Sequence, residues 1–197
     1  MPPARRDARR GTLCALAALL VTLAACGAAP RAEGPRIGGP FALVDQNGAP
    51  ATEAMLNGKW TAVFFGYTFC PDVCPTTLAT LALAQSRLGE RARDFRVVFI
   101  SLDPERDTPG QLRTWLASPA FPRGAVGLTG APARIATVAR AYHVYYRKAG
   151  SGAGYSLDHT SVVYLMGPDG AFRRPIDVAE PPERVAAQIT AAMDSAR

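Results

Sequence analysis

The sequence predicts one α/β domain in which a central mixed β-sheet is flanked by helices and preceded by an N-terminal β-hairpin. Strand-like and helix-like segments alternate early in the chain, and a hairpin followed by a helix comes last. The densely apolar segments 59–65 and 96–101 have the composition of strands buried on both faces. After an N-terminal export signal, about 170 residues remain, which suits a single domain.

The first half of the predicted domain begins with the hairpin. Residues 41–48 form a short strand that enters an Asn-Gly turn, and the second arm lies near 51–52. The strand at 59–65 ends at Gly66. A helix follows from Pro75, a favourable first helical residue, to about residue 88, with an apolar stripe along one face. The strand at 96–101 comes next.

The second half completes the sheet and its covering helices. After a polar loop, we predict helices at 109–117 and 133–142 and a short strand at 144–147. A glycine-rich, mobile stretch follows at 149–154. Finally, strands at 160–166 and 171–175 form a hairpin around the turn Gly167-Pro168-Asp169-Gly170, and an amphipathic helix closes the chain at 182–193.

Residues 1–25 have the features of a lipoprotein signal peptide. A basic start is followed by an almost entirely apolar run at 13–24, which is shorter than the about 20 apolar residues of a membrane-spanning helix. The run ends in Leu23-Ala24-Ala25-Cys26, which is similar to a bacterial lipobox. The resemblance implies cleavage before Cys26, a lipid on its sulfur and a membrane-anchored protein that faces the periplasm or the cell exterior. An ordinary signal peptide with a chance cysteine is the alternative.

The segment after Cys26 and the charge balance narrow the range of partners. Residues 26–40 are rich in Gly, Pro and Ala, so we expect a flexible tether that leads to a folded domain at 41–197. Without the four Arg and one Asp of residues 1–25, 18 basic residues remain against 15 acidic ones, a formal net charge of +3. The basic residues are scattered and form no aromatic-interleaved stripe, so no nucleic-acid partner is expected.

The segment Cys70-Pro71-Asp72-Val73-Cys74 carries the most chemical information. It places two thiols where a buried strand runs into a helix, as in the thioredoxin fold, in which the helix start favours thiolate. Three residues separate the cysteines, which permits a bite wide enough for a metal ion, while a disulfide is also feasible. Cys14 leaves with the signal and Cys26 would be lipidated, so an intramolecular disulfide would have to join Cys70 and Cys74. A redox pair, a metal site and an inert staple all stay open.

His159 is the candidate third ligand. The chain has two histidines, and His143, at the end of a helical pattern, is interpreted as a packing or capping residue. His159 has a carboxylate beside it and precedes a hairpin strand whose entrance faces the cysteine loop in a thioredoxin-like fold. Two thiolates and one imidazole suit copper in both oxidation states. Zinc accepts the same ligands, usually with a fourth one in structural sites.

Three segments together resemble the SCO/SenC proteins, which assemble cytochrome c oxidase. They are the Cys70–Cys74 loop followed by Pro75, the loop Ser101-Leu102-Asp103-Pro104-Glu105-Arg106-Asp107-Thr108-Pro109, and Asp158-His159-Thr160. The resemblance runs from about residue 41 to the last helix. It implies a thioredoxin-fold protein that binds copper through Cys70, Cys74 and His159.

The resemblance leaves two functions open. One is a metallochaperone that delivers copper to the CuA centre of cytochrome c oxidase subunit II, without catalytic turnover. The other is a thiol-disulfide oxidoreductase that reduces the CuA-ligand cysteines of the same target. Other copper chaperones and thioredoxin-like reductants are further candidate partners. A peroxidase role fits least, because the second cysteine is not in the usual resolving position.

Two carboxylates are candidates for a supporting role at the site. Asp103 either binds a partner or adjusts the copper site, or else it is a turn and capping residue before Pro104. Asp158 either orients His159 or caps the strand entry. Asp107 and Thr108 are interpreted as a helix start.

Overall fold

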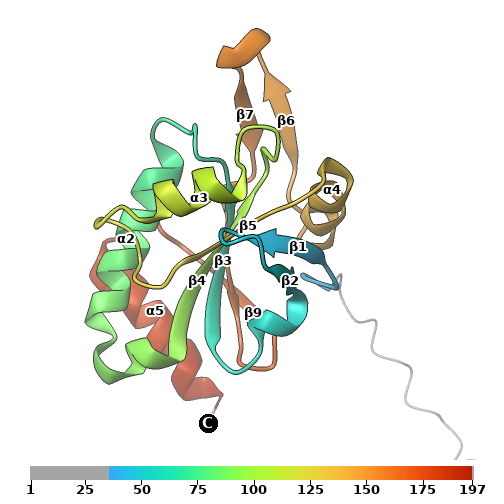
Figure 1. Cartoon of the computed structure of the whole chain (residues 1–197). Coiled ribbons are helices and arrows are strands. Elements are labelled where there is room, and N and C mark those ends of the chain that lie inside the picture. The colour runs from blue at the N-terminus through green and yellow to red at the C-terminus, as the bar shows by residue number, and fades with distance from the viewer. Residues whose placement is uncertain (1–35, 197) are drawn as a thin grey trace, which may run out of the picture. The chain divides into compact units, whose positions relative to one another are not determined.

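Residues 36–196 are described in the computed structural model of the protein. They form a seven-stranded mixed sheet in the order β2-β1-β5-β4-β3-β8-β9 and a separate two-stranded hairpin, β6–β7 (Figure 1). The strands of the large sheet are β1 (Ala42–Asp45), β2 (Pro50–Thr52), β3 (Trp60–Gly66), β4 (Phe95–Ser101), β5 (Val126–Thr129), β8 (Val163–Met166) and β9 (Phe172–Ile176). The small hairpin consists of β6 (Tyr146–Ala149) and β7 (Ser156–His159).

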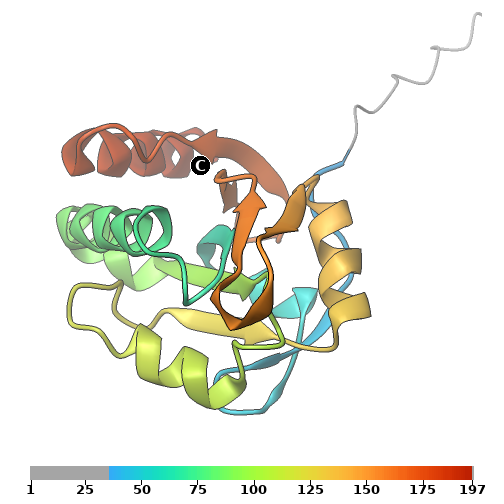
Figure 2. The ribbon, with the colours of Figure 1, turned by 90° about the horizontal axis from the view of Figure 1, so that it is seen from above.

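Within residues 36–196, four α-helices lie on both faces of the sheet (Figure 2). They are α2 (Val73–Arg87), α3 (Pro109–Leu116), α4 (Pro132–Ala141) and α5 (Pro182–Ser195), and short 3-10 helices occur at Glu53–Leu56, Gly89–Asp94 and Gly152–Gly154. Side chains of α2, α3 and α5 share one buried cluster, whereas those of α4 belong to the other. The predicted mixed sheet flanked by helices, with its N-terminal β1–β2 hairpin, is confirmed.

The central strand β3 is buried on both faces of the sheet, so helices are needed on each face. All seven of its residues are buried, and alternate side chains point to opposite faces. Phe64 therefore packs with the α2 side, and Phe65 packs with the α4 side. Burial on both faces favours the nearly continuous apolar composition that predicts this strand from the sequence.

The parallel pairing of β3 with β4 places two loops together. The register pairs Gly66 with Ser101 at the ends of the two strands. Because parallel strands end at the same edge of a sheet, the loop into α2 and the polar loop after β4 leave from neighbouring points. β8 runs antiparallel to β3 on its other side.

The sequence-based prediction differs from the structure in several places. It omits β5 and β7. The glycine-rich stretch at 149–154 contains the last residue of β6 and most of the turn that joins β6 to β7, so it forms the tip of a hairpin. α2 begins at Val73, two residues before the predicted start. The end of the predicted tether belongs to the folded unit, because the Gly38 N–H donates to the Ala141 carbonyl at 2.8 Å.

Both outer strands of the large sheet contain proline. β2 has three residues and starts with Pro50. β9 carries Arg173, Arg174 and Pro175, all exposed.

Candidate metal centre

The cysteine loop is a tight turn between β3 and α2. The Cys70 N–H donates to the Tyr67 carbonyl at 3.2 Å. Asp72 occupies the N-cap position but makes no capping hydrogen bond with its side chain. Instead, the Cys74 N–H donates to the Cys70 sulfur at 3.4 Å. The half-buried Cys70 sulfur thus caps the start of the helix.

Cys74 is completely buried, and both thiols are free. Burial raises the pKa of the Cys74 thiol; the neighbouring Cys70 and the charge of Asp107 raise this pKa further, whereas a hydrogen bond with the Tyr67 backbone lowers it. Cys74 is therefore a protonated thiol at neutral pH in the metal-free protein. A metal ion that binds it must displace this proton.

His159 ends β7 and points its ring at Cys74. Its Nε2 atom lies 3.8 Å from the Cys74 sulfur, although the two residues are 85 positions apart. The His159 Nδ1 atom is 3.0 Å from the Thr160 carbonyl oxygen. A carbonyl oxygen only accepts hydrogen bonds, so Nδ1 carries the proton and the Nε2 lone pair faces the thiol. The ring of Tyr67 stands edge-on to the imidazole, with centroids 6.0 Å apart.

The spacing of Cys74 and His159 fits two ligands of one ion. Metal–sulfur bonds of about 2.3 Å and metal–nitrogen bonds of about 2.1 Å, at angles of about 110° to 120°, separate the ligand atoms by about 3.6 to 3.8 Å. Among residues 36–196, no group of three or more His, Cys, Asp or Glu side chains is already gathered around a metal position. The three candidate ligands, Cys70, Cys74 and His159, therefore do not yet surround one common position in this structure.

Asp158 does not support the His159 ring as the sequence suggested. Neighbouring residues in a strand point to opposite faces, and the Asp158 carboxylate pairs with Arg147 across the hairpin at 2.9 Å. The Thr160 carbonyl orients the imidazole instead. The interpretation of His143 as a capping residue agrees with its position, because it follows α4 in the left-handed conformation at φ 56°.

Asp103 is the turn residue that the sequence allowed, because its carbonyl accepts the N–H groups of Arg106 and Asp107, and its side chain is buried as well. Only 2% of it is exposed. Its carboxylate accepts hydrogen bonds from the Arg106 Nε–H and from the Tyr155 hydroxyl, both at 2.5 Å. Through Tyr155 it contacts the segment that leads into β7.

Asp107 has a larger role than the predicted helix start. It is fully buried, and its carboxylate accepts hydrogen bonds from Thr68 and Ser101. Burial raises the pKa of Asp107, and these hydrogen bonds oppose the rise. Asp107 thus links the loop after β4 to the start of the cysteine loop. The only sign of this role in the sequence is an acidic residue in the polar loop that follows a buried strand.

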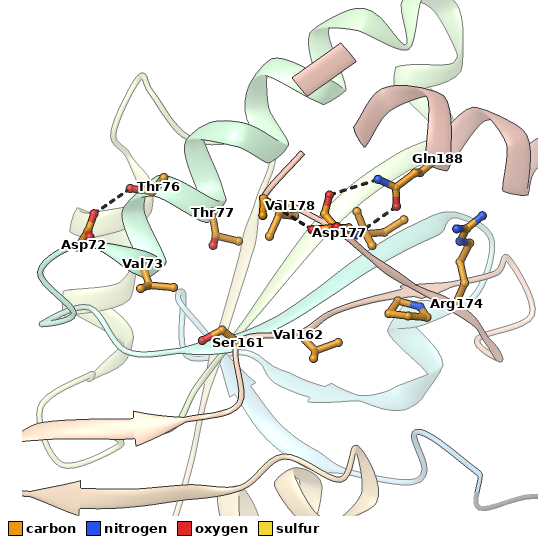
Figure 3. Close-up of a pocket in the computed structure, with 13 residues that line it drawn as sticks. Asp72, Val73, Thr76, Thr77, Ser161, Val162, Arg174, Asp177, Val178 and Gln188 are labelled. Atoms are coloured by element: carbon orange, nitrogen blue, oxygen red, sulfur yellow. Dashed lines mark hydrogen bonds between the residues drawn. The ribbon is translucent and has the colours of Figure 1, made fainter. Parts of the chain in front are cut away.

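A groove of about 660 Å³ borders the cysteine loop (Figure 3). Asp72 and Val73 line it at one end, and it continues along β9 toward Asp177 and Gln188, which are hydrogen-bonded to each other. Its lining residues do not include Cys70, Cys74 or His159. Two exposed apolar side chains, Phe69 and Val73, flank Cys70 on either side in the sequence.

The candidate lipidation site lies outside the described residues. Cys26 and the predicted signal peptide fall before residue 36, so the structure says nothing about them. Within residues 36–196, no helix has the length and apolar character needed to cross a membrane.

The family model and the similar proteins of known name indicate the same family. The SCO1/SenC family model matches residues 29–194. Protein SCO1 homolog 1, mitochondrial, from Arabidopsis thaliana is 45% identical over 145 residues, which make up 73% of this chain and 43% of that protein. The chain therefore spans less than half the length of this relative.

Solved structures show the same fold. Bradyrhizobium japonicum ScoI with copper bound matches with a TM-score of 0.73 at 45% identity, over 79% of this chain and 99% of that one. BsSco, described as a member of the Sco family of cytochrome c oxidase assembly proteins with a disulfide switch, matches with a TM-score of 0.63 at 26% identity, over 81% of this chain and 96% of that one. The chain thus has the thioredoxin-like fold that its sequence predicts.

Proposed function

This chain belongs to the SCO1/SenC family, and we propose that it is a copper metallochaperone that holds the ion on Cys70, Cys74 and His159. Its acceptor is the CuA centre of cytochrome c oxidase subunit II. This proposal rests on the family membership, on the Sco family's description as cytochrome c oxidase assembly proteins and on the copper bound to a similar Sco structure.

The observation that carries the proposal is the approach of His159 Nε2 to the Cys74 sulfur at 3.8 Å. One imidazole and two sulfurs form a mixed set that accepts both oxidation states of copper, because thiolates favour Cu(I) and imidazole suits Cu(II). The Nδ1–H bond to Thr160 keeps the Nε2 lone pair available to the ion. Buried Cys74 is the internal ligand, whereas half-buried Cys70 is the one an acceptor reaches first.

Copper binding by the full reduced chain tests this ligand set. We expect His159→Ala to weaken Cu(II) binding at least tenfold and to change the Cu(II)–thiolate absorption band. The matched control is His143→Ala, since His143 is the only other histidine and lies exposed at the end of α4. Unchanged affinity and absorption in His159→Ala would remove His159 from the site.

Delivery requires a separate measurement with the acceptor. The copper-loaded chain, mixed with the reduced, copper-free soluble domain of oxidase subunit II, should yield the absorption of the CuA centre. Location on the outer side of a bacterial membrane through a lipid on Cys26 follows from the sequence of residues 1–26 and is part of the proposal. Mass spectrometry of the membrane-extracted protein should show Cys26 as the acylated N-terminal residue.

A thiol-disulfide oxidoreductase that reduces the CuA-ligand cysteines is the second candidate. The position of the two cysteines favours this function. The half-buried Cys70 sulfur caps the start of α2, and Cys74 is buried one turn further along the chain. Attack by one thiolate and resolution by the other would transfer the disulfide from the acceptor to Cys70 and Cys74. His159→Ala should retain this reduction while its copper binding weakens, whereas Cys70→Ser should lose the reduction and most of the copper affinity.

A further inference from the structure

We propose that Arg106 and Asp107 are positioning residues that hold the cysteine loop and the histidine hairpin in register for copper. The inference rests on the proposed copper function and names the residues that set the geometry of that site. Neither side chain is a ligand. Each fastens one half of the ligand set to the turn after β4, which we call the clamp (residues 103–107).

Asp107 fastens the cysteine loop. Its Oδ2 atom accepts from the Thr68 N–H at 3.0 Å and from the Ser101 hydroxyl at 2.6 Å, and its Oδ1 atom accepts from the Thr68 hydroxyl at 2.6 Å. Thr68 lies two residues before Cys70, and its neighbour Tyr67 accepts the Cys70 N–H. The position of the loop thus depends on the buried carboxylate.

Arg106 fastens the histidine hairpin. Its guanidinium donates to the Tyr155 carbonyl at 3.0 Å and stacks on the Tyr155 ring, with its central carbon 3.7 Å from the ring centroid. Tyr155 directly precedes β7, the strand that ends in His159. The same guanidinium lies 4.6 Å from the ring centroid of Phe69, the residue before Cys70. Arg106 therefore contacts both halves of the ligand set.

Hydrogen bonds and a buried ion pair within the clamp hold its own residues together. The backbone N–H groups of Arg106 and Asp107 both donate to the Asp103 carbonyl, at 3.2 and 2.8 Å. The Asp103 carboxylate pairs with Arg106, whose side chain is only 16% exposed. By contrast, the hairpin's other ion pairs join Arg147 to Asp158 and Lys148 to Glu105. Their side chains are at least half exposed, so these pairs contribute little to stability.

Copper binding in a double-mutant design tests the role of Arg106. In the full reduced chain, Arg106→Gln should weaken Cu(II) binding about tenfold and move the thiolate absorption toward that of His159→Ala. Arg106 is hydrogen-bonded to Tyr155 and stacked on its ring, and its contact with Phe69 is longer, so its main effect should pass through His159. The same change should therefore have less than a twofold effect in the His159→Ala background. Arg147→Gln on the same hairpin is the matched control and should bind like the wild type. An equal loss in both backgrounds, or no loss, would overturn the role of Arg106.

Asp107→Asn should behave differently, because Asp107 acts through the cysteines. We expect its copper affinity to fall at least fivefold in both backgrounds, and its Cys70–Cys74 equilibrium with a dithiol buffer to shift at least threefold. Arg106→Gln should leave that equilibrium within twofold of the wild type. If Asp107→Asn leaves both quantities unchanged, its role in the clamp is wrong.

Amide hydrogen exchange of the metal-free chain tests the clamp without copper. Arg106→Gln should speed exchange in β7 at least tenfold and leave β3 unchanged, while Asp107→Asn should speed exchange at Thr68. Unaltered exchange would overturn the clamp even if the wild type binds copper. Conversely, a wild-type protein that binds no copper would overturn the proposed function. The exchange rates of the variants would still show whether the clamp positions the two segments. If Arg106→Gln unfolds in a thermal melt, Arg106→Lys keeps the charge without the planar fork and replaces it.

Discussion

Gly66 lies directly against the buried sulfur of Cys74. A Cβ atom at position 66 would stand 2.7 Å from the Cys74 sulfur and 2.9 Å from Cε2 of Phe99. Both neighbours are completely buried, so neither has space into which it can retreat. The end of β3 must therefore carry a glycine for Cys74 to keep its place beside His159.

Gly66→Ala should accordingly damage both stability and the metal centre. Overpacking of this kind costs about 1 to 3 kcal/mol of unfolding free energy, which urea denaturation of the reduced chain measures. Displacement of Cys74 should also weaken copper binding. Gly110→Ala is the control, because its Cβ would meet nothing closer than 3.9 Å. Equal stability of the two variants would contradict the close contact.

Stability of the reduced, metal-free chain should fall as the solution becomes alkaline. Burial raises the pKa of the Cys74 thiol above its unfolded value of about 8.5. Between that value and pH 10, the unfolded chain loses the thiol proton while the folded chain keeps it, so each pH unit costs up to about 1.4 kcal/mol. Denaturation at pH 7.5 to 10 should show this slope, and Cys74→Ala should remove most of it. If Cys74→Ala shows a slope of the same size, another titrating group causes the loss of stability at alkaline pH.

The two thiols should react at different rates. Cys70 is half-buried and Cys74 is completely buried, so iodoacetamide should label Cys70 at least tenfold faster in the native reduced chain. Peptide mass spectrometry over time measures both rates. Unfolding in urea should bring the two rates close together. Similar rates in the native protein would mean that Cys74 is more accessible than the structure shows.

Oxidation should close the metal centre. A disulfide between Cys70 and Cys74 would remove both proposed sulfur ligands and leave His159 as the only member of the proposed set. We expect the oxidised chain to lose at least 100-fold in copper affinity and to regain it after reduction with a dithiol. Copper binding that survives oxidation would point to ligands outside this set.

The elements that the sequence predicted well are those with strong local patterns. β3 and β4 are densely apolar, and α2 has both a proline near its start and a glycine after its end. β5 lacks such a pattern because it is four residues long and contains Gly127, whose missing side chain makes room for Leu116 of α3. β7 has a single buried residue, Leu157, so no alternation marks it as a strand.

The candidate ligands could be named from the sequence, whereas the residues that support them could not. The cysteine spacing and a histidine beside a carboxylate are visible in the sequence. The partner of Asp107, by contrast, is Thr68, 39 positions earlier, and only the parallel pairing of β3 and β4 brings the two together. The opposite facing of Asp158 and His159 follows from β7 being a strand, which local sequence did not reveal.

The prolines in the outer strands of the large sheet affect how this protein meets other chains. An exposed edge with free N–H groups is a template onto which another chain can add a strand, and this is a common route to aggregation. Proline has no N–H to donate, and charged neighbours disfavour stacking of sheets. With Pro50 in short β2 and Pro175 beside two arginines in β9, both edges resist strand addition. At these two edges, recognition of another chain is left to side chains rather than to strand pairing.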